Sequence, residues 1–225
     1  MKKKSNRIRA FLRENCQIYL FALFLTVWLG YFLSSWQERE RRMMHCALDD
    51  AIPFVPAFII PYLMWYAYVP LMLAAVCFLD KKYFPRQCAA FFGGAWACIA
   101  VLIAFPTAVD FRPDAAGDGA FLWLCRFIFA ADRPVNVFPS LHCYEALCVH
   151  LTAFSCPRLK KMTAFRVASA AMTILICLST VFIKQHSALD LAAGCAAALI
   201  AALPVMVLNR RRPKNDNKTV YYKTV

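Results

Sequence analysis

Charged side chains are scarce in this 225-residue chain. Asp, Glu, Lys and Arg make up only 17% of it, whereas 61% of its residues are hydrophobic. Soluble globular domains are roughly 45–50% apolar and about 25% charged. This deficit of charge argues strongly against a water-soluble domain. Because the apolar residues also occur in long blocks, the sequence is typical of an integral membrane protein.

The sequence also lacks any Cys-x-x-Cys pair, although it contains 11 cysteines. Most of these cysteines lie inside or at the ends of apolar blocks, where a free thiol behaves as a small hydrophobic side chain. We therefore expect them to pack between helices. Only Cys46 and Cys125 are placed to pair outside the membrane. Internal repeats and low-complexity segments are absent from the sequence as well.

Six apolar blocks reach or approach the length of about 20 residues that a membrane-spanning helix needs. They cover residues 16–36, 55–79, 88–109, 140–156, 165–183 and 187–208. The predicted fold is all-α, a polytopic bundle of six transmembrane helices over residues 16–208, between a basic leader (1–15) and a basic tail (209–225). The first block is too long for a secretory signal peptide and lacks a small-residue cleavage site, so we interpret it as a retained anchor.

The basic residues predict the orientation of this bundle. If the N-terminus is inside, 19 of the 26 Lys and Arg residues fall on the cytoplasmic side, as the positive-inside rule requires. Both termini are then cytoplasmic. The same distribution accounts for the net charge of +13 without nucleic acid as a partner, because cytoplasmic basic residues meet anionic lipid headgroups. The longest outer connection, residues 110–139, is expected to hold a short interfacial helix over 121–131.

Three polar clusters adjoin the apolar blocks, at residues 105–113, 132–142 and 179–190. Ionisable residues are costly to keep near a membrane segment, so each cluster is a candidate functional site. The charge count places all three clusters on the outer side. Pro139 and Ser140 also predict the start of a helix there.

The histidines of these clusters suggest acid–base or nucleophilic chemistry. His186 and Asp190 are four residues apart, so on a helix they share a face, and the carboxylate can hold one ring nitrogen protonated. The other nitrogen is then free as a nucleophile or base. His142 begins a different helix and is the complementary acid in this interpretation.

Positive groups accompany the histidines. Arg112, Lys184 and the backbone amides near Ser140 would supply the field that a transferring phosphoryl group requires. Arginine can also hold two phosphate oxygens at once. The residue types therefore favour phosphoryl chemistry on a membrane lipid.

At these residues the sequence resembles the type 2 phosphatidic acid phosphatase superfamily, which is related to the vanadium haloperoxidases. The three motifs of that superfamily are Lys-x6-Arg-Pro, Pro-Ser-Gly-His and Ser-Arg-x5-His-x3-Asp. The first motif is matched by Arg112-Pro113, with Phe105 in place of the lysine. The second is matched by Pro139-Ser140-Leu141-His142, with leucine in place of glycine. The third is matched by Ser179-Thr180-x5-His186-x3-Asp190, with threonine in place of arginine.

The combination Phe-Pro-Ser-Leu-His with Ser-Thr-x3-Lys-Gln-His-x3-Asp is similar to the branch that includes inositol phosphorylceramide synthases. The resemblance covers residues 88–208. It implies that His186 attacks phosphorus to give a phosphohistidine, that Asp190 orients it and that His142 protonates the leaving group. It further implies that Arg112, Ser140 and Lys184 hold the phosphoryl oxygens, and that neither a metal nor another cofactor is needed.

A second register exists for the first motif. The motif with arginine in place of lysine is also matched by Arg126 and Arg133-Pro134, which six residues separate. We favour Arg112 as the phosphate clamp, because it ends a membrane segment, and keep Arg133 as the alternative. Arg126 and Arg133 would otherwise bind lipid headgroups or pair with Asp132.

The sequence thus predicts an integral membrane lipid phosphatase that hydrolyses a lipid phosphate or diphosphate at the outer face. A bacterial inner membrane is the predicted location. A lipid phosphotransferase of the inositol phosphorylceramide synthase type is the first alternative. A non-enzymatic transporter in which Glu145, His150 and Asp190 form a polar path is the second alternative. The residue types of His142, His186 and Asp190 also suit zinc, but no fourth ligand or close pair of histidines supports such a site.

Overall fold

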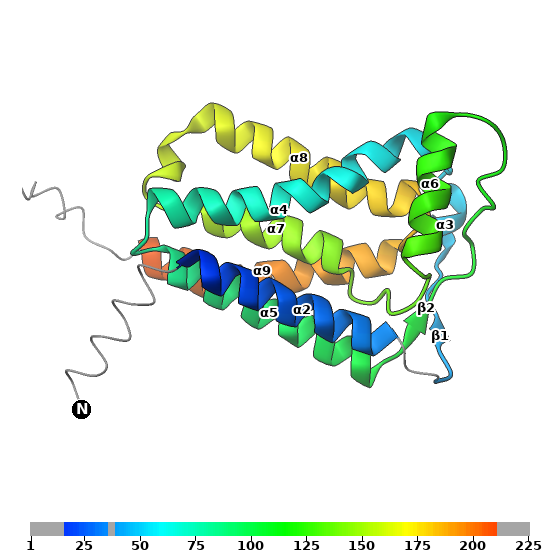
Figure 1. The fold of residues 1–225 in the computed structure, drawn as a ribbon, viewed down its shortest axis with the longest axis horizontal. Coiled ribbons are helices and arrows are strands. Elements are labelled where there is room, and N and C mark those ends of the chain that lie inside the picture. The colour runs from blue at the N-terminus through cyan, green and yellow to red at the C-terminus, as the bar shows by residue number, and fades with distance from the viewer. Residues whose placement is uncertain (1–15, 36–38, 211–225) are drawn as a thin grey trace, which may run out of the picture.

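The predicted all-α class is confirmed by the structure, a computed structural model that describes residues 16–35 and 39–210. Six helices lie roughly side by side in a bundle (Figure 1). They are α2 (Cys16–Ser35), α4 (Ile59–Leu79), α5 (Phe84–Ala104), α7 (Leu141–Ala153), α8 (Thr163–Phe182) and α9 (Ala188–Arg210). The shorter elements are β1 (Arg42–Met43), α3 (Ala47–Ala51), η1 (Pro56–Phe58), β2 (Thr107–Ala108), α6 (Ala120–Ala131) and η2 (Leu159–Lys161).

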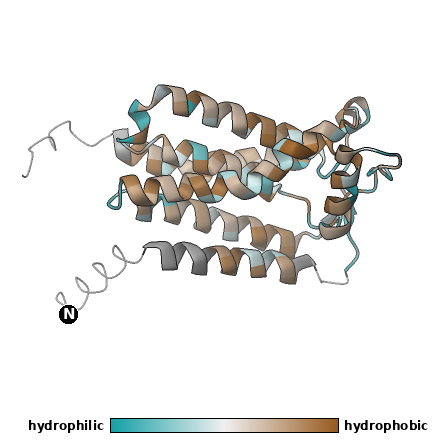
Figure 2. Ribbon diagram, turned by 45° about the horizontal axis from the view of Figure 1, so that its top comes forward, coloured by the Kyte–Doolittle hydropathy of each residue, from teal (hydrophilic) through white to brown (hydrophobic). Residues whose placement is uncertain are grey.

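Four helices are long and apolar enough to cross a membrane. They comprise Pro56–Leu79, Phe84–Ala104, Thr163–Phe182 and Ala188–Leu208. Large apolar side chains on them, such as Phe78 and Ile200, are exposed at the outside of the bundle. Figure 2 shows hydrophobic residues along these helices and many of the hydrophilic ones near the bundle ends. The structure therefore supports an integral membrane protein.

The remaining two predicted spans also form helices, and one of them is shorter than the other five. Helix α7 has 13 residues, about 20 Å at 1.5 Å per residue, against a hydrocarbon core of about 30 Å. Helix α2 has 20 residues, as many as α8, but it is not among the four helices named above. Six spans thus remain a prediction, whereas four are supported.

The connections that carry the three polar clusters lie at one end of the bundle. We call this the loop end; it contains α3, α6, β1 and β2, and α2 begins and α9 ends at the opposite end (Figure 1). At the loop end β1 pairs in parallel with β2, so that Arg42 is opposite Thr107. Which side of the membrane the loop end faces remains a prediction from the basic residues.

Helix α7 is the central helix and packs against α4, α5, α8 and α9. Its start agrees with the sequence prediction, because Ser140 is the N-cap residue and its hydroxyl accepts a hydrogen bond from the Cys143 amide. Helix α9 approaches this start closely at Gly194. A Cβ atom there would overlap the carbonyl oxygen of Ser140. Glycine therefore allows the helices that carry the second and third motifs to lie in contact.

The connection between α5 and α7 contains the predicted short helix, α6. Its Arg126 donates hydrogen bonds to the carbonyl oxygens of Ala115 and Gly117, at 2.8 and 2.9 Å, and so fastens the preceding loop to the helix. Cys46 and Cys125 are both free thiols in the structure.

Candidate active site

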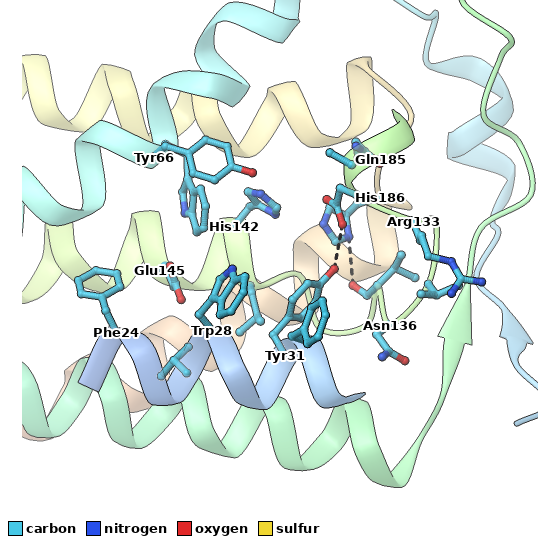
Figure 3. A pocket seen from close by; sticks show the side chains of 18 of the residues that line it. Phe24, Trp28, Tyr31, Tyr66, Arg133, Asn136, His142, Glu145, Gln185 and His186 are labelled. Carbon is cyan, nitrogen blue, oxygen red and sulfur yellow. Dashed lines mark hydrogen bonds between the residues drawn. The ribbon is translucent and has the colours of Figure 1, made fainter. Parts of the chain in front are cut away.

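A cavity of about 370 Å³ lies toward the loop end of the bundle, between α2, α4, α7 and the loops that precede α7 and α9. Small-molecule sites are typically about 300–1,000 Å³, so this cavity can hold a substrate headgroup. Figure 3 shows its polar side chains converging from several elements. They are Arg112, Asp132, Arg133, Asn136, His142, Glu145, Gln185 and His186.

The two histidines of the predicted site meet in this cavity. His142, in the first turn of α7, and His186, in the turn between α8 and α9, have ring centroids 5.7 Å apart. The His142 ring packs against Tyr62 and Trp65 of α4, with centroid distances of 4.6 and 4.4 Å. Its Nε2 atom has no hydrogen-bond partner among the described residues. Aromatic packing thus orients the ring and leaves this nitrogen available to a ligand.

The other ring is held by a backbone carbonyl. His186 Nδ1 lies 3.1 Å from the Val137 carbonyl oxygen. A carbonyl can only accept, so Nδ1 carries the proton and Nε2 keeps its lone pair. Thr107 fixes this carbonyl, because its Oγ1 accepts hydrogen bonds from the amides of Val137 and Phe138, both at 3.1 Å.

Asp190 is near His186 but is arranged differently from the sequence prediction. Its Oδ2 lies 3.6 Å from His186 Nδ1, beyond an ordinary hydrogen bond, and accepts one from the Ser187 amide at 2.8 Å. The two residues do not share a helix face, because α9 begins only at Ala188. Asp190 therefore stabilises the turn that carries His186 and places a negative charge close to its ring.

Both candidate arginines line the cavity. Arg112 donates from Nη1 to the Asp132 carbonyl oxygen at 2.7 Å, and its guanidinium carbon lies 5.0 Å from the centre of the Phe129 ring. Burial lowers the pKa of Arg112, and the nearby Asp132 carboxylate counteracts this effect. The Nε atom of Arg112 is buried without a partner among the described residues. Arg133 lies at the rim and is exposed.

Lys184 does not line the cavity. Its backbone has a left-handed φ of 59°, and its ammonium group donates to the carbonyl oxygens of Asp49 and Ile52, at 2.6 and 2.5 Å. The structure thus directs this lysine toward α3, away from the histidines. The expectation that Lys184 replaces the missing arginine of the third motif gains no support from this position.

Ser140 is also separated from the cavity. It is fully buried, its hydroxyl caps α7, and its amide donates to the Asp190 carbonyl oxygen at 3.1 Å. These contacts fit a role in joining α7 to α9. They do not offer its hydroxyl to a phosphoryl group.

Two further donors in the cavity were not identified from the sequence. Gln185 is only 1% exposed, and neither its amide nitrogen nor its amide oxygen has a partner among the described residues. The indole nitrogen of Trp65 is likewise buried and unpartnered there. Buried polar atoms normally have partners, so these free ones are groups at the cavity wall that can bind a ligand or water. The sequence feature that could have identified Gln185 as a site residue is its position directly before His186 of the third motif.

Asp132 is satisfied by two tyrosines. Tyr31 of α2 and Tyr62 of α4 each donate a hydroxyl hydrogen bond to its carboxylate, both at 3.0 Å. Among residues 16–35 and 39–210, the ion pairs found are His45–Asp50 and His186–Asp190, so neither Arg126 nor Arg133 pairs with Asp132. The carboxylate instead joins α2 and α4 to the end of α6.

Asp49, in α3, supports the turn that carries His186. Its carboxylate accepts hydrogen bonds from the Ser187 hydroxyl at 2.6 Å, the Ala188 amide at 2.8 Å and the Cys46 amide at 2.9 Å. Burial raises the pKa of Asp49, but these hydrogen bonds outweigh it and lower the pKa below its ordinary value. Together with Lys184, Asp49 fastens α3 across the beginning of α9.

The described part of the chain contains no group of three or more His, Cys, Asp or Glu side chains arranged to hold a metal ion. The zinc site considered for His142, His186 and Asp190 is therefore not formed by these residues as they stand.

No family model, curated protein or solved structure matches the chain. The fold and the site together define an all-helical membrane protein with two histidines and two arginines in one cavity.

Proposed function

We propose that the chain is an integral membrane lipid phosphatase, which hydrolyses a lipid phosphate or diphosphate through a phosphohistidine. The observation that carries this proposal is the meeting of His142 and His186, 5.7 Å apart, in a cavity that Arg112 and Arg133 also line. These four residues come from three separate segments of the sequence. The motif resemblance to type 2 phosphatidic acid phosphatases supports the same chemistry.

His186 is the nucleophile in the proposed reaction. Because Val137 holds the proton on Nδ1, the Nε2 lone pair attacks phosphorus, and the phosphorus–oxygen bond to the lipid breaks. The leaving oxygen takes the electron pair of that bond and a proton from His142. Water then attacks the phosphohistidine and gives its proton to His142, and phosphate leaves as the phosphorus–nitrogen bond breaks.

The donors around the histidines suit the charge that develops on the phosphoryl oxygens. The guanidinium groups of Arg112 and Arg133 and the amide nitrogen of Gln185 supply fixed positive groups at the cavity wall. Arg112 is held at one end by the Asp132 carbonyl, so it is oriented before the substrate binds. Asp190, in this proposal, adds negative charge near the His186 ring and favours its phosphorylated form.

The shape of the cavity favours a lipid over a soluble phosphate ester. One wall of the cavity is a single face of α2, formed by Phe24, Val27, Trp28, Tyr31 and Phe32. Two aromatic residues of α4, Trp65 and Tyr66, lie opposite this wall. Trp28 and Tyr66 line the cavity and are still 60% and 55% exposed, so it reaches the side of the bundle. A hydrocarbon chain could enter between α2 and α4, and the basic-residue count would place this entrance near the outer face.

The test is phosphate release by the purified protein in detergent, with a panel of lipid phosphates and diphosphates. We expect His186→Ala to abolish release and His142→Ala to lower kcat by about 10²- to 10⁴-fold. His45→Ala is the matched control, because His45 is exposed and bonds only Asp50. Release that survives His186→Ala would refute the mechanism.

Two additions to this assay separate the alternatives. An added alcohol that becomes phosphorylated would identify a phosphotransferase, because the alcohol then replaces water in the second step. Release that is lost with EDTA would indicate metal-assisted hydrolysis. A trapped phosphoprotein that is labile to acid, stable to alkali and absent in His186→Ala would confirm the intermediate.

A further inference from the structure

One carboxylate in the cavity has no partner among the residues that the structure describes. Asp132 accepts two tyrosine hydroxyls, as described above, whereas Glu145 receives no hydrogen bond or ion pair from any residue in the described part of the chain. Glu145 is only 4% exposed, and it lines the cavity. The proposed phosphoryl transfer makes no use of it.

An unpartnered carboxyl group is costly to bury within an apolar bundle, whether it is ionised or protonated. In its ionised form it also repels the anionic phosphoryl group that the neighbouring arginines would attract. A hydrogen-bond donor on the ligand, separate from the phosphoryl oxygens, would remove both costs. Glu145 therefore marks a second polar contact in the cavity.

The position of Glu145 shows on which side of phosphorus this donor lies. Glu145 follows His142 by three residues on α7, about 4.5 Å further from the loop end at 1.5 Å per residue. Figure 3 shows it beside Phe24 and Trp28, whereas Arg133 and Asn136 lie toward the loop end. A donor at Glu145 thus belongs to the lipid side of the phosphate ester, not to a group attached at its outer side.

We propose that Glu145 binds a hydroxyl or N–H group on the backbone of the lipid, a few bonds from the phosphate ester oxygen. This inference rests on the proposed lipid phosphatase function and specifies its substrate class. Monoacylglycerol phosphates and phosphorylated sphingoid lipids carry such a donor. Diacylglycerol phosphates and prenyl phosphates do not, so the cavity discriminates against them.

The experiment compares two substrates that differ in this donor alone. One is a monoacylglycerol phosphate, and the other is its analogue with hydrogen in place of the free hydroxyl. We expect the wild-type kcat/KM to favour the hydroxyl form by tenfold or more, because a site built around a substrate hydroxyl discriminates strongly against its absence. In Glu145→Leu the ratio should approach one. In Glu145→Gln it should be intermediate, because the amide oxygen still accepts.

A buried polar residue on the same helix provides the control. The hydroxyl of Thr152 donates only to carbonyl oxygens of α7 itself, and Thr152 does not line the cavity, so Thr152→Val should keep the wild-type ratio. A 3-deoxyceramide phosphate in the same assay, which keeps the amide N–H and has no free hydroxyl, distinguishes an N–H donor from a hydroxyl.

The outcomes separate this inference from the function on which it rests. A wild-type enzyme that hydrolyses both substrates equally well overturns the role of Glu145 and leaves the phosphatase standing. An equal loss on both substrates in Glu145→Leu also overturns it, since Glu145 would then be structural. If Glu145→Leu does not fold, the isosteric Glu145→Gln decides by the same ratio. No phosphate release from any lipid by the wild type overturns the proposed function itself.

Discussion

Asp49 is the residue whose replacement most sharply tests the arrangement of the site. It lies in α3, far from the motifs in the sequence, and three hydrogen bonds connect its carboxylate to Ser187, Ala188 and Cys46. In Asp49→Ala these donors lose their acceptor, and the fully buried Ser187 hydroxyl is left without it. The turn that presents His186 would then lose its attachment to α3.

The expected loss can be estimated from these contacts. Hydrogen bonds to a charged group contribute about 1.5–3 kcal/mol each, and contributions that share one acceptor are not additive. We therefore expect Asp49→Ala to lower the free energy of unfolding by about 3–5 kcal/mol, and Asp49→Asn by about half as much. Phosphate release should fall in the same order, because His186 would no longer be held in position.

Asp50 provides the matched control for this change. Its side chain is 70% exposed and, within the described residues, forms an ion pair with His45 alone, so Asp50→Ala should alter the free energy of unfolding by less than about 0.5 kcal/mol. The measurement is denaturant-induced unfolding in detergent, together with phosphate release at matched protein concentration. Equal effects of the Asp49 and Asp50 replacements would refute the assignment.

The pKa of Asp49 adds a pH dependence with a definite sign. Its pKa in the folded protein lies below the unfolded value of about 4, because the hydrogen bonds favour the ionised form. The stabilisation is therefore complete above the unfolded pKa and is lost as the pH falls through the folded pKa. The difference in unfolding free energy between wild type and Asp49→Asn should shrink as the pH is lowered below about 4. A difference that grows instead would contradict the lowered pKa.

Two further replacements test the packing and the phosphate contacts. Gly194→Ala places a methyl group against the Ser140 carbonyl and should destabilise the protein by about 1–3 kcal/mol in thermal unfolding. Gly93→Ala is the control, because an added Cβ there meets open space, and it should be neutral or slightly stabilising. Similar effects at both positions would argue against close contact between α7 and α9. Arg112→Lys replaces the planar guanidinium, whose separate nitrogens can bind the Asp132 carbonyl and the substrate at once, with donors on a single nitrogen, so we expect kcat/KM for phosphate release to fall by about 10- to 100-fold. An unchanged value would move the phosphate clamp to the other arginine.

The sequence was most informative where local chemistry determines structure. The apolar blocks located the helices, and Pro139 and Ser140 predicted the start of α7 because a capping hydroxyl acts on amides only a few residues away. The motif spacing also indicated that His142 and His186 belong together, and both line the cavity. These features depend on neighbouring residues or on a pattern that can be read along the chain.

The remaining features depend on conformation or on distant contacts. Lys184 has a left-handed backbone, which a motif spacing does not reveal, and it therefore contacts α3 and not the cavity. The spacing of His186 and Asp190 suggested one helix face, but α9 begins between them. Asp49 meets Ser187 across 138 positions, and no periodicity connects residues so far apart.

The α2 wall of the cavity has a practical consequence. A hydrophobic first helix is usually regarded as interchangeable with any other anchor, yet here Tyr31 reaches Asp132 and the same helix face encloses the histidines. A chimera that exchanges this helix for an unrelated membrane anchor would still insert into the bilayer. It would nevertheless lack one wall of the cavity that holds the histidines. The chimera would therefore be inserted correctly and still be inactive.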